Sequence, residues 1–355
     1  MPWMIDDLDT PAVLIDLDRV ENNLARAQSY ADAHGLRLRP HIKTHKIPDL
    51  ARRQVELGAI GITCQKLGEV EVMVDAGLDD ILLTFNVLGR TKTARLAALA
   101  RRARLTVTID NAVVAAEVDA AMRDAGVRLD VLVECDTGAK RCGVQTPEEA
   151  AALAKVVDGL GGLRFAGLMT YPPRASTGAV QAWLAEAIAQ IGRAGLECRT
   201  VSNGGTPDLY RAHEVKAATE HRPGTYIYSD RMQSSWGFGS FDDCAIRVLT
   251  TVVSRPTDAR AIFDAGSKTL TSDLVQGQEG YGYVVEYPQL VLERFSEEHG
   301  HVDCSGSNAR PRVGERVTVI PNHACAVTNM HDVVYGVRGD RVERAFRVEA
   351  RGKVQ

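Results

Sequence analysis

The sequence predicts an α/β protein: a (β/α)8 barrel of the TIM type followed by a C-terminal antiparallel β domain. Up to about residue 245, strand-like and helix-like stretches alternate, as in a parallel sheet with crossover helices. This span is close to the roughly 250 residues that such a barrel takes. Beyond it, helical periodicity ends and short strand-like stretches alternate with polar or glycine turns. A doubly wound sheet is the competing fold, because spacing alone does not exclude it.

The alternation gives seven or eight strand-then-helix units. The first six pair 36–42 with 46–58, 59–65 with 66–77, 79–85 with 90–103, 104–110 with 111–126, 128–136 with 146–160, and 164–171 with 178–195. Residues 198–205 and 221–228 are the last strand-like stretches of the series. The barrel is therefore expected over residues 12–245 and the β domain over residues 246–355. In the β domain, the expected strands lie within 245–255, 259–266, 280–288, 289–300, 315–327 and 332–350.

Composition excludes several classes of protein. The chain has 355 residues, 45% of them hydrophobic, and a net charge of -4 without any basic stripe, so no nucleic acid partner is expected. No apolar run approaches the roughly 20 residues that span a membrane, and the first residues lack a signal-like apolar stretch. The seven cysteines are scattered and contain no C-x-x-C pair, which favours reduced thiols in a cytoplasmic protein.

Polar residues follow the predicted barrel strands at the edge where barrel enzymes place their active sites. Lys43 follows the first strand and Gln65 the second. Arg141 lies in "DTGAKRCG" after a hydrophobic strand, and Tyr171 ends "GLMTY". Scattered surface polarity does not account for this many polar strand ends. The carboxyl ends of the strands are therefore the expected site.

Two glycine-rich turns end the last two predicted strands. One contains Gly204, Gly205 and Thr206, and the other contains Gly224 and Thr225. Such turns expose backbone N–H groups that bind phosphate, and barrels often bind phosphate at this position. An ordinary tight turn is the alternative for each one alone.

Lys43 lies in "RPHIKTHK", residues 39–46, which places two histidines and two lysines close together. A lysine at a barrel mouth beside a phosphate site can form a Schiff base with pyridoxal 5'-phosphate (PLP). A solvated surface lysine is the alternative.

His323 and Cys325 form a second candidate site in "PNHACAV". If this segment is a strand, the two side chains point to the same face. Imidazole and thiolate suit zinc, and two protein ligands leave coordination positions for water or substrate. The alternative is a histidine with satisfied hydrogen bonds beside a buried thiol.

Taken together, these motifs resemble the fold-type III PLP enzymes, whose N-terminal barrel is like that of alanine racemase. Within that group, the chain is similar to the D-threonine aldolase and D-serine dehydratase family almost from end to end. The matching segments are "DTPAVLIDLDRVENNL", "RPHIKTHK", "DTGAKRCG", "RPGTYIYSD", "DAGSKTL" and the late H-x-C motif.

The resemblance implies roles for individual residues. Lys43 would hold PLP covalently with His41 and His45 packed around it, Arg141 would contact the phenolic oxygen, and Tyr171 would lie by the pyridine ring. The phosphate would be bound by Gly204, Gly205, Thr206, Gly224 and Thr225, with Tyr226 nearby. His323 and Cys325 would hold a divalent metal: zinc, manganese or magnesium. The resemblance also implies a homodimer and an N-terminal strand, within residues 1–11, that joins the β domain.

The implied activity is that of a metal-assisted, PLP-dependent lyase acting on D-3-hydroxy amino acids. Retro-aldol cleavage to glycine and an aldehyde is slightly favoured, and dehydration to a keto acid and ammonia is the alternative. The H-x-C pair resembles the dehydratase branch, whereas some aldolases have H-x-D. Some aldolases also carry a histidine shortly after the position of Tyr171, but this chain reads "YPPRAST" there.

Two further functions stay open. An amino acid racemase would need a second acid or base, for which Tyr281, Tyr283 and Tyr287 are candidates. A PLP carrier shares the barrel but lacks a second domain.

Overall fold

The computed structural model describes residues 3–308 and 310–355 of the chain. The chain divides into two compact units. The barrel unit consists of Arg26–Lys43, Pro48–Gly224 and Lys353–Gln355. The β unit consists of the chain up to Ala25, Thr44–Ile47 and Thr225–Gly352. The domain boundaries given above stay predictions.

The barrel unit contains a parallel sheet of eight strands, and the predicted fold class is confirmed. Its strands are β2 (Arg37–Leu38), β3 (Ile62–Cys64), β4 (Asp80–Leu83), β5 (Arg104–Ile109), β6 (Leu129–Cys135), β7 (Leu163–Thr170), β8 (Thr200–Asn203) and β9 (Glu220–His221). Their order is β2-β9-β8-β7-β6-β5-β4-β3, and a parallel bridge between His41 and Thr63 joins the two ends. All carboxyl ends therefore meet at one rim.

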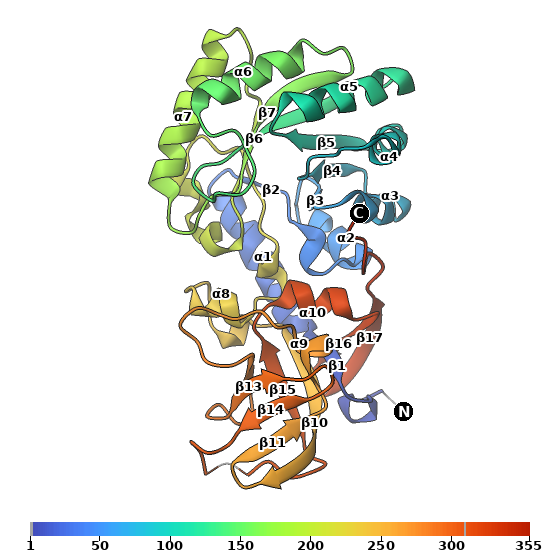
Figure 1. Ribbon diagram of the computed structural model, residues 1–355, viewed down its shortest axis with the longest axis vertical. Helices are drawn as coiled ribbons and strands as arrows, with labels where there is room; N and C mark the ends of the chain where they lie inside the picture. The colour runs from blue at the N-terminus through green and yellow to red at the C-terminus, as the bar shows by residue number, and fades with distance from the viewer. Residues whose placement is uncertain (1–2, 309) are drawn as a thin grey trace. The chain divides into compact units, whose positions relative to one another are not determined.

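Helices follow the strands and cover the outside of the sheet, as Figure 1 shows for α3 to α7. The helices are α1 (Leu17–Ala33), α2 (Pro48–Glu56), α3 (Leu67–Asp75), α4 (Arg90–Ala100), α5 (Ala112–Ala125), α6 (Pro147–Asp158) and α7 (Thr177–Arg193). Side-chain caps fix some of the starts: Asn111 accepts from the backbone N–H of Val114, and Thr146 from that of Glu149. In the described part of the chain, no helix is long and apolar enough to cross a membrane.

The first and last barrel strands are shorter than predicted. β2 ends at Leu38 and β9 at His221, whereas the sequence predicts strands over 36–42 and 221–228. Pro40 and Pro223 follow these strands, and proline has no N–H to continue a ladder. The chain instead turns into short 3-10 segments, η2 (Ile42–Thr44) and η4 (Thr225–Ile227).

The β unit is built on a second sheet of nine strands. They are β1 (Ala12–Asp16), β10 (Ile246–Thr257), β11 (Arg260–Phe263), β12 (Gly282–Val284), β13 (Val291–Phe295), β14 (Gly300–Asp303), β15 (Arg316–Pro321), β16 (Val333–Arg338) and β17 (Arg341–Arg347). The N-terminal strand thus lies at Ala12–Asp16, just beyond the segment 1–11 in which it was expected. It pairs antiparallel with β10 and parallel with β16.

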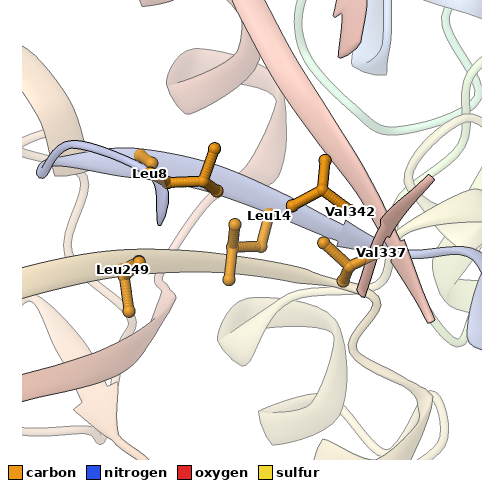
Figure 2. Close-up of a cluster of buried hydrophobic side chains, with 6 residues drawn as sticks. Leu8, Leu14, Leu249, Val337 and Val342 are labelled. Atoms are coloured by element: carbon orange, nitrogen blue, oxygen red, sulfur yellow. The ribbon is translucent and has the colours of Figure 1, made fainter. Parts of the chain in front are cut away.

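A cluster of buried aliphatic side chains holds β1 in this sheet. Figure 2 shows Leu8, Leu14, Leu249, Val337 and Val342 gathered along the strand. Leu14 is 4% exposed, and burial of a leucine contributes about 1.5–3 kcal/mol. The cluster joins residues from both ends of the sequence.

The prediction that "PNHACAV" is a strand is wrong. β15 ends at Pro321, and His323 is the N-cap residue of α10 (Ala324–Met330). Asp230, directly before α8 (Arg231–Ser235), accepts a 2.9 Å hydrogen bond from the backbone N–H of Ala324. This bond satisfies an N–H that the helix start leaves without a partner. This unit also contains the short helix α9 (Ser267–Leu270).

Candidate active site

Lys43 lies on η2, two residues beyond His41, whose bridge with Thr63 closes the barrel. The backbone N–H of Lys43 donates to His41 Nδ1 at 3.3 Å, so His41 Nε2 carries the proton and donates to Gln65 Oε1 at 3.1 Å. Gln65 in turn donates to the Thr84 carbonyl at 2.7 Å. Burial, followed by the positive charge of Lys43, holds the pKa of His41 well below its usual value. A neutral His41 therefore fixes the turn that carries Lys43.

Arg141 lies in a tight loop after β6. Asp136 Oδ1 accepts from the backbone N–H groups of Gly138 and Lys140, at 2.9 and 3.1 Å. Burial raises the pKa of Asp136, but these backbone hydrogen bonds outweigh it and the pKa is lowered. The Arg141 guanidinium lies 3.7 Å from Glu134, whose pKa is raised by burial and only partly lowered by Arg141.

Tyr171 is in contact with two other predicted site residues. The guanidinium carbon of Arg141 lies 4.9 Å from the centre of its ring, which is a cation–π distance. A Cβ added to Gly205 would lie 2.8 Å from Tyr171 Cε2. The structure therefore brings Arg141, Tyr171 and Gly205 together at the rim.

The two glycine-rich turns also meet. The backbone N–H of Gly224 donates to Thr206 Oγ1 at 3.1 Å, and His221 Nε2 donates to the Gly205 carbonyl at 3.0 Å. Gly204 has a φ of +84°, and a Cβ there would collide with the His221 ring. Both positions of the first turn therefore need glycine, because a Cβ at either one would come too close to a neighbouring ring.

Arg222 was missed by the sequence analysis, although it lies in the quoted segment "RPGTYIYSD". It is buried at the strand ends and donates to Ser202 Oγ at 2.9 Å and to the Thr170 carbonyl at 2.8 Å. Burial lowers the pKa of Arg222 to about 10, against the charges of Glu220 and Glu134 that raise it. It places a buried positive charge beside the two turns.

These residues fit a phosphorylated aldehyde cofactor such as PLP. Gly205 caps the 3-10 segment η3 (Thr206–Glu214), so the N–H groups at its start have no partner within the segment. The two glycines let this backbone pass close to the rings of His221 and Tyr171, which a Cβ at Gly204 or Gly205 would meet. Lys43 supplies an amine and Arg222 a buried positive charge, which complement an aldehyde and a phosphate.

Cys325 lies in the β unit and has two hydroxyl neighbours. Thr44 Oγ1 lies 3.2 Å and Thr225 Oγ1 3.8 Å from its Sγ. Thr225, predicted to bind phosphate, thus has its side chain at Cys325. Tyr226, the next residue, is buried at 3% exposure.

His323 lies between Cys325 and an acidic residue that the sequence analysis missed. Its Nδ1 is 2.6 Å from Asp273 Oδ2. Burial lowers the pKa of His323, but its polar neighbours outweigh burial and raise the pKa to about 9. In order of size, these are a hydrogen bond with Cys325, the charges of Cys325 and Asp230, and the hydrogen bond to Asp273.

The donor set of His323 and Cys325 fits a divalent metal such as zinc. The two side chains are in mutual hydrogen-bond contact although the segment is helical, and Asp273 occupies the other ring nitrogen, as carboxylates commonly do for metal-binding histidines. In the described part of the chain, no group of three or more histidine, cysteine, aspartate or glutamate residues is arranged to hold a metal ion. A metal here would need further ligands from water or substrate.

Two known domain families match successive parts of this chain. The chain matches the alanine racemase N-terminal domain over residues 15–232 and a putative serine dehydratase domain over residues 245–337. It is 36% identical to a D-threonine aldolase from Arthrobacter sp, over 97% of this chain and 93% of that protein. It belongs to the D-threonine aldolase and D-serine dehydratase family.

Other members of this family are similar over nearly the whole length. The crystal structure of D-threonine aldolase from Filomicrobium marinum is 37% identical, with a TM-score of 0.93, covering 100% of this chain and 98% of that one. A D-threo-3-hydroxyaspartate dehydratase from Delftia sp. (strain HT23) is 34% identical over 90% of this chain and 91% of that protein. The predicted family is confirmed, and both kinds of relative are lyases. Alanine racemases, at 13–15% identity, share the fold alone.

Proposed function

We propose that this protein is a PLP-dependent lyase that cleaves D-3-hydroxy amino acids to glycine and an aldehyde. The observation that carries the proposal is the similarity to D-threonine aldolases along almost the entire chain. It is supported by the cluster at the barrel rim, where Arg141, Tyr171 and Gly205 lie together on the side of the strand ends. We also propose the individual residue roles that follow.

In the barrel unit, Lys43 provides the amine that holds the cofactor, which when bound supplies an electron sink for bonds broken at the substrate Cα. The N–H groups at Gly205 and Thr206, joined to Gly224 by the Thr206 hydroxyl, bind the phosphate. Arg141 would contact the phenolic oxygen of the bound cofactor, and Tyr171 would lie against its ring. Neutral His41 keeps the Lys43 turn in place without adding a second positive charge.

In the β unit, His323 and Cys325 would hold a divalent metal, which would supply a Lewis acid for the substrate 3-hydroxyl. Thr225, whose side chain contacts Cys325, directly follows Gly224 of the phosphate turn in the sequence. One relative is supportive: a solved D-threo-3-hydroxyaspartate dehydratase with a cysteine-to-alanine mutation is in the metal-free form.

Dehydration is the second candidate, because the H-x-C pair of His323 and Cys325 resembles the dehydratase branch. In aldol cleavage, the 3-hydroxyl loses its proton and the Cα–Cβ bond breaks, which gives glycine and an aldehyde. In dehydration, Cα loses its proton and the 3-hydroxyl leaves, which gives a keto acid and ammonia after hydrolysis. The products separate the two reactions without ambiguity.

The test is a product assay with the purified protein. D-threonine, D-serine and D-threo-3-hydroxyaspartate are incubated with PLP and zinc, manganese or magnesium, and glycine and ammonia are quantified separately. We expect the wild type to form glycine and an equimolar amount of aldehyde. We expect Lys43→Ala to form neither product and to lose the visible absorbance of bound PLP. Ammonia with a keto acid would establish the dehydratase. If neither product formed while PLP stayed bound, both lyase proposals would be wrong.

The proposal extends to assembly and location. We propose a cytoplasmic homodimer that acts on a small molecule and binds neither nucleic acid nor membrane. The net charge of -4 without a basic stripe, and seven scattered cysteines without a C-x-x-C pair, are compatible with this. Light scattering after size exclusion measures the mass, and a monomer at assay concentration would contradict the dimer.

A further inference from the structure

Asp273 forms a short contact with one nitrogen of His323. The 2.6 Å distance from Asp273 Oδ2 to His323 Nδ1 is that of a strong, charge-assisted hydrogen bond. The carboxylate accepts, so the proton stays on Nδ1. Nε2 is then the nitrogen that remains for the hydrogen bond with Cys325.

The segment that carries Asp273 is braced by the residue next to His323. Asn322 is fully buried, and its side-chain amide donates to the carbonyl groups of Asp273 at 2.9 Å and of Gly280 at 3.0 Å. Arg231 donates to the Asn322 side chain and to the same Gly280 carbonyl, each at 3.2 Å. Asn322 and His323 are consecutive, so one buried amide sets the distance between the carboxylate and the imidazole.

Stability alone is a weak reason for this arrangement. The Asp273 side chain is 46% exposed and that of His323 33% exposed, and ion pairs of this exposure contribute about 0–1 kcal/mol. A bracing network centred on a fully buried amide is more than such a pair needs. By contrast, the orientation of a metal-binding imidazole by a carboxylate commonly changes metal affinity by about 10–100-fold.

We propose that Asp273 is a positioning residue for a metal ion at His323 and Cys325. Its carboxylate keeps the proton on His323 Nδ1, fixes the plane of the ring, and leaves the Nε2 lone pair for the ion. The inference rests on the proposed function, because it requires that His323 and Cys325 bind a metal. It adds a third residue, from a segment 50 positions earlier in the sequence, to that site.

The experiment measures metal affinity and needs no substrate. The metal-free protein with PLP bound is titrated with zinc in the presence of a competing chelator, for the wild type, Asp273→Asn and Asp273→Ala. Glu279→Gln is the matched control, because Glu279 is an exposed carboxylate in the same segment. Binding of cobalt, with its thiolate absorbance, reports separately whether Cys325 remains a ligand.

We expect the zinc dissociation constant to rise by about 10–100-fold in Asp273→Ala, and by less in Asp273→Asn, whose amide oxygen still accepts a hydrogen bond. Glu279→Gln should match the wild type, and metal-free stability in urea should be nearly unchanged in all variants. Wild-type affinity in both Asp273 variants would overturn the inference but leave the metal site intact. If the wild type itself bound no zinc, the metal part of the proposed function would fail first, and this inference with it.

Discussion

Thr44 Oγ1 lies 3.2 Å from Cys325 Sγ, and Thr44 is the residue that directly follows Lys43. One peptide bond and one hydrogen bond therefore connect the lysine proposed to hold PLP with the thiol proposed to hold a metal. Thr44 is completely buried, so its hydroxyl has little opportunity to bond elsewhere.

Replacing Thr44 should therefore weaken metal binding. Cys325 must be deprotonated to bind a metal, and the Thr44 hydroxyl then donates to the thiolate. Thr44→Val keeps the shape but removes this bond, which is worth about 1 kcal/mol, or about fivefold in the zinc dissociation constant. Thr44→Ser retains the hydroxyl and should stay close to the wild type. Equal affinities in Thr44→Val and Thr44→Ser would show that the bond is irrelevant to the metal.

Gly205→Ala should weaken PLP binding. Its Cβ would lie 2.8 Å from Tyr171 Cε2, so the Tyr171 ring must move from the position where it faces Arg141. Because the same turn supplies phosphate-binding N–H groups, we expect a PLP dissociation constant raised about tenfold or more, measured by absorbance titration. Gly178→Ala is the control, since a Cβ there meets nothing within 4 Å. Unchanged affinity in Gly205→Ala would argue against a phosphate at this turn.

Arg222→Met should destabilise the barrel. The substitution removes two hydrogen bonds between buried groups, those to Ser202 Oγ and the Thr170 carbonyl, each worth about 1 kcal/mol. It also removes the buried positive charge that acts on Glu220. We expect a loss of about 3 kcal/mol in the free energy of unfolding, measured with urea. Arg199→Met, at an exposed arginine, should change it little. A similarly small effect at Arg222 would mean that water replaces its hydrogen bonds.

Stability should fall in acid partly through His221. Burial lowers the pKa of His221 to about 4, from about 6.5 in an unfolded chain. Between these values the unfolded state binds a proton that the folded state does not. The contribution is thus present above about pH 6.5 and is lost as the pH falls towards 4, with a total of about 3 kcal/mol.

His221→Asn should remove this part of the pH dependence while it keeps a donor for the Gly205 carbonyl. The free energy of unfolding is measured in urea at a series of pH values between 4 and 7. His299→Asn, at an exposed histidine, should follow the wild-type curve. A His221→Asn curve as steep as the wild type would assign the acid sensitivity to other groups.

The barrel could be predicted from the sequence because its signal is local. Apolar strands alternate with helical stretches, and caps such as Asn111 and Thr146 lie beside the helices that they start. The lengths of β2 and β9 were overestimated, although Pro40 and Pro223 each remove a backbone N–H from the ladder just beyond the strand ends. That signal was available in the sequence.

The metal site was only half predictable. His323 and Cys325 were found as a pair, but the strand assignment failed because α10 depends on Asp230, which caps it from a distant part of the sequence. The role of Asp273 could not be predicted for the same reason, since it depends on a contact with His323, 50 positions later in the sequence. Arg222 lay inside a recognised motif, but its burial could not be known before the strands were placed.

The position of β1 has a consequence for biosynthesis. The ribosome makes this strand before any other strand of its sheet, yet both its neighbours, β10 and β16, are made much later. Until then, both edges of a short apolar strand are exposed to other nascent chains, which is a situation that favours aggregation. Slow translation or overexpression should therefore lower the soluble yield of this protein more than that of a protein whose early strands pair at once. Chaperones that shield the emerging β1 segment should raise the soluble yield.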